Sequence, residues 1–221
     1  MRSFRVLSHL LTYPQVEWIS HMDELKQALA DEGVVKGKVL KTLLSFMDEL
    51  AAADLMEIQE AYVELFDRGR ANCLHLFEHV HGESRFRGQA MIELADKYQE
   101  KGLQIGTGEL PDYLPLFLEF VSICEPEEGI ETLAQAAPVI ATIGEKLKRS
   151  KSGYASVMAA IVALSGVKLS KAELEKAADA ALPDIQSLDE LDEQWKEPEA
   201  FTGAPDCGTC APNETPTLGA L

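Results

Sequence analysis

The sequence predicts an all-α fold, a single-domain bundle of many helices. Apolar residues recur at the three- and four-residue spacing of amphipathic helices through most of the chain. No run of alternating β-branched residues is long enough to predict a sheet. With 221 residues, 46% of them hydrophobic, the chain is long enough to bury one core.

Helix-start and helix-stop residues divide the first hundred positions into segments. Pro14 suits the first turn of a helix, and Gly33 suits a helix end. Asp54 followed by Glu57 is typical of an N-terminal cap. The helix that starts at Pro14 is expected to bury Val16, Ile19, Met22, Leu25 and Leu29. The predicted helices cover residues 3–11, 14–33, 37–52, 55–66, 72–79 and 84–101.

The second half begins with a glycine-rich loop over residues 102–111. Asp112 is expected to cap a helix that runs to residue 120. Pro126 opens another helix, which Pro138 is expected to kink or divide, because proline lacks the backbone N–H donor. Residues 153–164 are apolar nearly all round, which predicts a central buried helix. Ser170 then opens a helix to about residue 181.

The composition changes near Pro183. The last part of the chain contains four prolines between residues 198 and 216. From residue 170 onward it has twelve acidic residues and only three lysines. Such a segment cannot bury enough apolar surface to order itself. We therefore expect a helical domain over residues 1–182 and an acidic, proline-rich, weakly ordered tail over residues 183–221.

Charge and cysteine content exclude several classes. A net charge of −17 disfavours nucleic acid and favours a basic partner. No apolar run approaches the roughly 20 residues that a membrane helix needs, so we expect a cytosolic protein that is not integral to a membrane. Cys73 and Cys124 fit small core positions, and Cys207 and Cys210 form a lone C-x-x-C pair with no further ligands nearby.

The segment of residues 74–83 contains H-x-x-E-H, with His75, Glu78 and His79. On one helix, His75 and His79 would face the same way, as in some zinc hydrolases, where the glutamate activates a water. Two other interpretations stay open: hydrogen-bonded histidines at a helix end, and a binding surface. Similarly, Asp112 either caps a helix or forms, together with Glu109, an acidic lip that binds an arginine-bearing peptide.

These same segments carry a family resemblance. Residues 62–70 (YVELFDRGR), 74–85 (LHLFEHVHGESR) and 87–91 (RGQAM), with the opening Leu7-Ser8-x-Leu10-Leu11-x-Tyr13-Pro14, resemble the NarJ family, the nitrate reductase delta subunits or molybdenum cofactor assembly chaperones. The resemblance covers roughly residues 4–165. It extends to the related TorD/DmsD group of redox-enzyme maturation chaperones, which are single helical domains.

The resemblance implies a chaperone with no catalytic activity and no cofactor of its own. Its partner would be the apo catalytic alpha subunit of respiratory nitrate reductase, held through a basic, amphipathic N-terminal peptide until the molybdenum cofactor and an iron–sulfur cluster are inserted and the enzyme assembles at the membrane. Proteins of molybdenum cofactor biosynthesis are further candidate partners. A zinc hydrolase and a generic acidic adaptor are the alternatives.

The resemblance also places the peptide-binding residues. The family's Tyr-x-x-Leu-Phe block matches Tyr62, Leu65 and Phe66. Its acidic loop matches Glu109 and Asp112, with Tyr113 where histidine is common. The full predicted site is Tyr62, Leu65, Phe66, Phe77, Glu78, His79, Glu109, Asp112 and Tyr113.

Overall fold

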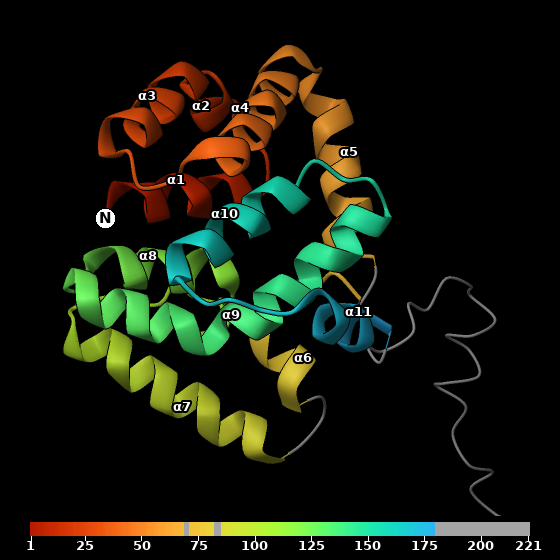
Figure 1. Cartoon of the computed structure of the whole chain (residues 1–221). Coiled ribbons are helices and arrows are strands. Elements are labelled where there is room, and N and C mark those ends of the chain that lie inside the picture. Colours follow the sequence, from red (N-terminus) through yellow and green to blue (C-terminus); the bar gives the residue numbers. More distant parts are fainter. Residues whose placement is uncertain (69–70, 82–84, 180–221) are drawn as a thin grey trace, which may run out of the picture. The chain divides into compact units, whose positions relative to one another are not determined.

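The computed structural model describes residues 1–68, 71–81 and 85–179. Within these residues the chain forms helices and one isolated β-bridge, so the all-α prediction is confirmed (Figure 1). The helices are α1 (Arg2–Leu11), α2 (Val16–Ile19), α3 (Met22–Glu32), α4 (Gly37–Ala52), α5 (Leu55–Phe66), α6 (Leu76–His81), α7 (Arg85–Glu100), α8 (Leu114–Ile123), α9 (Pro126–Arg149), α10 (Ala155–Ser165) and α11 (Lys171–Asp179).

Helix α10 is the centre of the core, as its all-round apolar sequence predicted. It packs against α9, α4 and α1 (Figure 1). Its side chains Val157, Met158, Ala160 and Ile161 are fully buried. Burial on several faces explains why this helix lacks the polar stripe of a surface helix.

Helix α1, which contacts α10, also packs along α8. The buried Ser8 hydroxyl donates to the Pro115 carbonyl oxygen at 2.8 Å, so this buried polar group is satisfied. At the start of α1, the Ser3 backbone N–H donates to Glu32 at the end of α3 at 2.6 Å. The N-terminal helix is therefore an integral part of the bundle.

The single helix predicted for residues 14–33 is wrong, because the structure divides it into α2 and α3. Backbone N–H groups of Ser20 and His21 close a turn onto Val16 and Trp18. Trp18 is buried and its indole N–H donates to the Tyr13 carbonyl oxygen at 3.3 Å, whereas Val16, predicted to face inward, is 59% exposed. Burying the large indole thus overrides the helical periodicity.

Two further expectations need correction. The helix predicted for residues 72–79 begins instead at Leu76, because residues 74–76 pair with residues 112–114: the Leu76 N–H donates to the Asp112 carbonyl oxygen at 3.0 Å, and the Leu114 N–H to the Leu74 carbonyl oxygen at 2.9 Å. Of the two effects expected at Pro138, division of the helix is wrong, because α9 continues from Pro126 to Arg149. The Asp54 cap is confirmed, since its side chain accepts from the Met56 N–H.

The predicted acidic tail of residues 183–221, including Cys207 and Cys210, lies outside the described residues. Cys73 and Cys124 are buried free thiols, as predicted. Among the helices that the structure describes, no segment combines the length and apolar character that crossing a bilayer would need.

Candidate functional site

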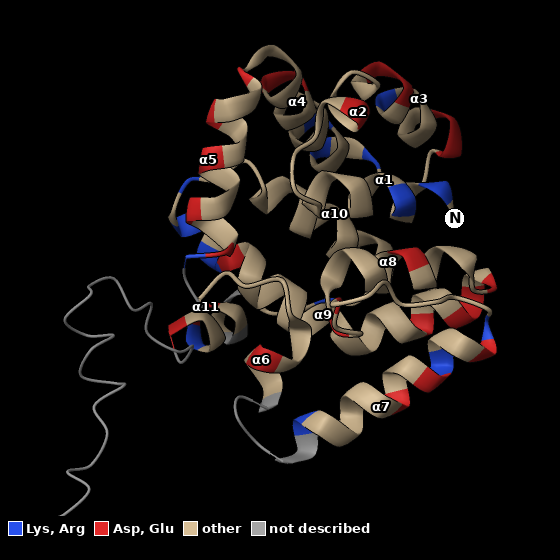
Figure 2. Cartoon of the chain, turned by 180° about the vertical axis from the view of Figure 1, so that it is seen from behind, with Lys and Arg blue, Asp and Glu red and all other residues tan. Residues whose placement is uncertain are grey.

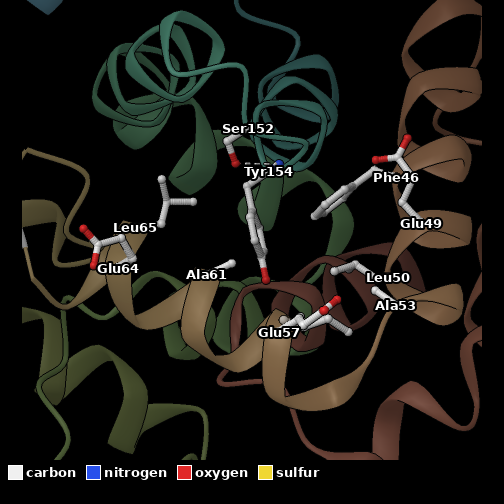
Figure 3. Close-up of a pocket in the computed structure, with 11 residues that line it drawn as sticks. Phe46, Glu49, Leu50, Ala53, Glu57, Ala61, Glu64, Leu65, Ser152 and Tyr154 are labelled. Carbon is white, nitrogen blue, oxygen red and sulfur yellow. Dashed lines mark hydrogen bonds between the residues drawn. The ribbon is translucent and has the colours of Figure 1, made fainter.

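A groove lies between α4, α5 and the start of α10, with a volume of about 480 Å³ (Figure 3). We call it the groove throughout. Side chains from α4 and α5 form its two long walls, and the residues before α10 form its inner end (Figure 3). The lining residues are Phe46, Glu49, Leu50, Ala53, Glu57, Ile58, Ala61, Glu64, Leu65, Ser152 and Tyr154.

Aromatic rings support the floor of the groove. The Tyr154 ring packs edge-on against Phe46 and Phe66, with ring centroids 4.8 and 5.0 Å away, and Tyr62 lies 4.9 Å from Phe66. Edge-to-face contacts of this kind hold rings in fixed orientations. Gly153 makes the packing possible, because a Cβ atom there would lie 2.1 Å from the Phe46 ring.

The rim of the groove is acidic. Glu49, Glu57 and Glu64 line it and are all exposed, and Figure 2 shows acidic positions recurring along α5. Arg68 pairs with Glu64 at 2.7 Å, one turn farther along the chain. No lysine or arginine is among the described residues that line the groove. An apolar trough with a carboxylate rim suits a segment that is apolar on one side and basic beside it.

The Tyr-x-x-Leu-Phe block lies at this groove. Leu65 lines it directly, whereas Tyr62 and Phe66 are buried beneath it. The Tyr62 hydroxyl donates to the Leu11 carbonyl oxygen at 2.8 Å and lies 3.3 Å from the Tyr113 hydroxyl. Burial raises the pKa of Tyr62, so the hydroxyl stays protonated. These two rings position the wall of the groove without forming its surface.

Asp112 is fully buried and organises a second region, the polar cluster of Cys73, His75, Glu78, His79 and Asp112. Its Oδ2 accepts from the Phe77 N–H at 3.0 Å, and its Oδ1 lies 3.3 Å from His75 Nδ1. The expectation that Asp112 caps the following helix is wrong. The N-cap of α8 is Tyr113, without a side-chain bond, and the Asp112 carboxylate instead binds the first turn of α6.

The other members of the polar cluster also bond to one another. The Cys73 thiol donates to Glu78 Oε2 at 3.2 Å, and Arg87 pairs with Glu78 Oε1 at 3.2 Å. Burial would raise the pKa of Glu78, but the thiol and the guanidinium outweigh it and hold that pKa below its usual value. Burial raises the pKa of Cys73 to about 12, which leaves a thiol too weakly acidic to act as a nucleophile.

The histidines of H-x-x-E-H do not share one helix face. His75 precedes α6 and forms the β-bridge with Tyr113, while His79 Nε2 donates to the Cys73 carbonyl oxygen at 2.8 Å. Burial lowers the pKa of His79 and favours its neutral form. The two rings therefore have separate internal partners, and within the described ranges no three metal-ligating side chains gather to hold an ion. The geometry favours the second interpretation, histidines hydrogen-bonded at a helix end.

The remaining predicted residues lie on two other surfaces. Phe77 lines a hollow of about 290 Å³ between α6, α7, α8 and α9. Glu109 and Tyr113 line an acidic hollow of about 630 Å³ together with residues of α1, α2 and α3. The predicted site residues are thus distributed over the groove, the polar cluster and these two hollows.

A family model described as nitrate reductase delta subunit matches residues 24–160. The chain belongs to the nitrate reductase delta subunit family. It is 38% identical over 208 residues to the nitrate reductase molybdenum cofactor assembly chaperone NarJ of Escherichia coli (strain K12), covering 93% of this chain and 87% of that protein. The resemblance found in residues 62–91 is confirmed.

Two further relatives agree. The chain is 36% identical over 198 residues to the probable assembly chaperone NarW of the same organism, covering 89% of this chain and 82% of the relative. It is 29% identical over 161 residues to the probable chaperone NarJ of Bacillus subtilis (strain 168), covering 73% and 86%. All three relatives are named as assembly chaperones of nitrate reductase and not as enzymes.

Sequence reasoning missed most of the groove in this member of the delta subunit family. Phe46, Glu49, Glu57, Glu64 and Tyr154 were not predicted as site residues. One signal was present: Glu57, Ala61 and Glu64 are spaced four and three residues apart, so they share one face of α5 beside its apolar stripe. No sequence pattern near Tyr154 indicated its contribution, because this residue lies nearly a hundred positions after α5 in the sequence.

Proposed function

We propose that this chain is the client-specific chaperone of a respiratory nitrate reductase. It binds the apo catalytic alpha subunit in the cytosol through a leader-like N-terminal peptide. It then holds that subunit competent for insertion of the molybdenum cofactor and an iron–sulfur cluster, before assembly at the membrane. Proteins of molybdenum cofactor biosynthesis are further partners in this proposal.

The observation that carries the proposal is the acid-rimmed apolar groove. Its volume of about 480 Å³ is large enough for several apolar side chains on one face of a helix. Glu49 and Glu57 offer charge to basic residues flanking that face. A second copy of this chain is a poor occupant, because it would bring a net charge of −17 to an acidic rim.

The apolar and acidic parts of the groove have different roles. Burial of the peptide's apolar side chains supplies most of the affinity, at about 25 cal/mol per Å² less the free energy of ordering the segment. The rim carboxylates are exposed, so solvent screens them, and they mainly set orientation and the rate of encounter. The Tyr13 side chain lines both the outer face of α5 and the acidic hollow that contains Glu109 and Tyr113. A peptide that contacts Glu109 and Tyr113 would therefore have to extend from the groove past Tyr13.

Isothermal titration calorimetry with a synthetic N-terminal peptide of the nitrate reductase alpha subunit tests the proposal. The wild-type chain is expected to bind with a Kd in the micromolar range or tighter. The double variant Glu49→Lys/Glu57→Lys is expected to bind at least about tenfold more weakly, because the rim then repels the basic residues. The double variant Asp96→Lys/Glu131→Lys, an equal charge change at exposed positions of α7 and α9 outside the groove, is the matched control.

Two outcomes count against the proposal. If the wild-type chain does not bind the peptide, the alpha-subunit N-terminus is not its ligand. If the control variant loses as much affinity as the rim variant, the effect comes from the overall charge and not from a defined site. A basic amphipathic peptide of unrelated sequence separates a client-specific chaperone from a generic acidic adaptor, since only the adaptor binds both peptides equally.

A further inference from the structure

Tyr154 occupies an unusual position at the groove. It is the N-cap residue of α10, only 5% of its surface is exposed, and its ring contacts Phe46, Tyr62 and Phe66. Packing against three aromatic rings leaves the side chain little freedom to rotate. The position of its hydroxyl group is therefore fixed by packing.

That hydroxyl has no hydrogen-bond partner among the residues that the structure describes. Its oxygen is buried, and burial raises the pKa of Tyr154, so the group is a neutral phenol. A buried polar group without a partner destabilises a protein, and native structures contain few of them. Asn72 Oδ1 and Arg87 Nε are likewise unpaired, but neither residue lines the groove.

Other buried tyrosines of this chain are satisfied. The Tyr62 hydroxyl donates to the Leu11 carbonyl oxygen, and the Tyr98 hydroxyl donates to the Pro111 carbonyl oxygen, each at 2.8 Å. Tyr154 differs in lining the groove, and Figure 3 shows its hydroxyl end pointing toward the stretch of α5 that carries Glu57 and Ala61. The unpaired hydroxyl thus lies directly behind the acidic rim.

We infer that Tyr154 selects an arginine side chain in the bound segment: the guanidinium donates one hydrogen bond to the Tyr154 hydroxyl oxygen and another to the Glu57 carboxylate. This inference rests on the proposed function and names the contact within its groove. Arginine fits because its planar fork carries five donors that point in different directions, whereas lysine offers a single charged centre. Binding uncovers the hydroxyl by a small displacement of the side chains that border it.

The inference predicts opposite effects on stability and on binding. Tyr154→Phe removes a hydroxyl that has no partner in the free protein, so the midpoint of urea unfolding stays unchanged or rises. The same variant binds the alpha-subunit peptide about tenfold more weakly, a difference of about 1.4 kcal/mol. Tyr98→Phe is the matched control: it loses a satisfied bond, so it unfolds at lower urea while its peptide affinity stays the same.

Peptide variants identify the partner of the hydroxyl. Each arginine of the peptide is replaced in turn by lysine and titrated into wild-type and Tyr154→Phe chains. One replacement is expected to weaken binding to the wild-type chain about tenfold and to add no further loss in Tyr154→Phe, because both changes remove the same bond.

Each contrary result has a distinct meaning. If the wild-type chain binds the peptide and Tyr154→Phe binds it equally well, the inference fails while the proposed function stands. Fully additive losses for every arginine also overturn it. A large drop in the stability of Tyr154→Phe would show that the hydroxyl is already bonded in the free protein. Absence of binding to the wild-type chain overturns both proposals.

Discussion

The polar cluster and the groove differ in how they use polar groups. In the polar cluster, Asp112, His75 and Glu78 each bond to a neighbour inside the protein. In the groove, Glu49 and Glu57 face solvent and the Tyr154 hydroxyl is unpaired. A cluster whose polar groups bond to one another stabilises the fold, whereas exposed carboxylates and an unpaired hydroxyl beside an apolar groove are available to a partner. In the proposed binding mode, the segment of residues 74–81 therefore belongs to the scaffold, and the client peptide contacts residues of α4, α5 and the start of α10.

The largest expected effect separates stability from binding at Asp112. Asp112→Ala leaves the Phe77 N–H and the His75 ring without their buried acceptor, so the free energy of unfolding should fall by about 3 kcal/mol. Asp112→Asn keeps the shape and one acceptor oxygen, so its loss should be smaller. Urea unfolding measures both variants. At urea concentrations below the unfolding transition, their peptide affinity should equal that of the wild-type chain. Weaker peptide binding by a variant whose stability is unchanged would instead indicate that the peptide binds at the polar cluster.

A comparison of Leu65 and Phe77 sharpens the assignment, since both were predicted as site residues and both are half-buried. Leu65 lines the groove and Phe77 lines the hollow beside α7. Leu65→Ala should weaken peptide binding about fivefold, because part of the apolar contact is lost. Phe77→Ala should leave the Kd within about twofold, because distant sites act independently. Calorimetry with the same peptide distinguishes the two surfaces, and the reverse pattern would favour the hollow.

The smallest effect concerns pH. Burial holds the pKa of His79 below its unfolded value of about 6.5, so the unfolded chain binds a proton more readily. Stability from this residue is therefore complete above pH ~6.5 and is lost as the pH falls toward the folded pKa, by at most about 1.4 kcal/mol per pH unit. Urea unfolding between pH 7.5 and 5.5 should show a shallower decline for His79→Gln than for the wild-type chain. The exposed His21→Gln is the control, and parallel curves for His79→Gln and wild type would refute the assignment.

Local sequence patterns predicted most of the helices. Asp54 with Glu57, Gly33 and Pro126 mark real helix boundaries, because caps and breakers act within one turn. The division at Ser20–His21 was missed because it depends on burying Trp18. The start of α6 was missed because residues 74–76 pair with residues 112–114, a contact between segments almost forty positions apart.

The candidate site was only partly predictable for the same reason. Family resemblance led to Leu65 and to its neighbours Tyr62 and Phe66, which all contribute to the groove or its support. It gave no indication that Asp112 is buried, since burial depends on how α6, α8 and the preceding loops pack. Nor did it indicate that Tyr154, from the start of α10, completes the groove with α4 and α5.

The proposed function assigns the client peptide to the acid-rimmed groove. Methyl chemical-shift mapping of the full chain, on addition of the alpha-subunit peptide, tests this claim most directly. The largest shifts are expected at Leu50, Ile58 and Leu65, with little change at Leu76, Leu94 and Val139 in the hollow beside α7. Largest shifts in that hollow, with the groove methyls unmoved, would contradict the account.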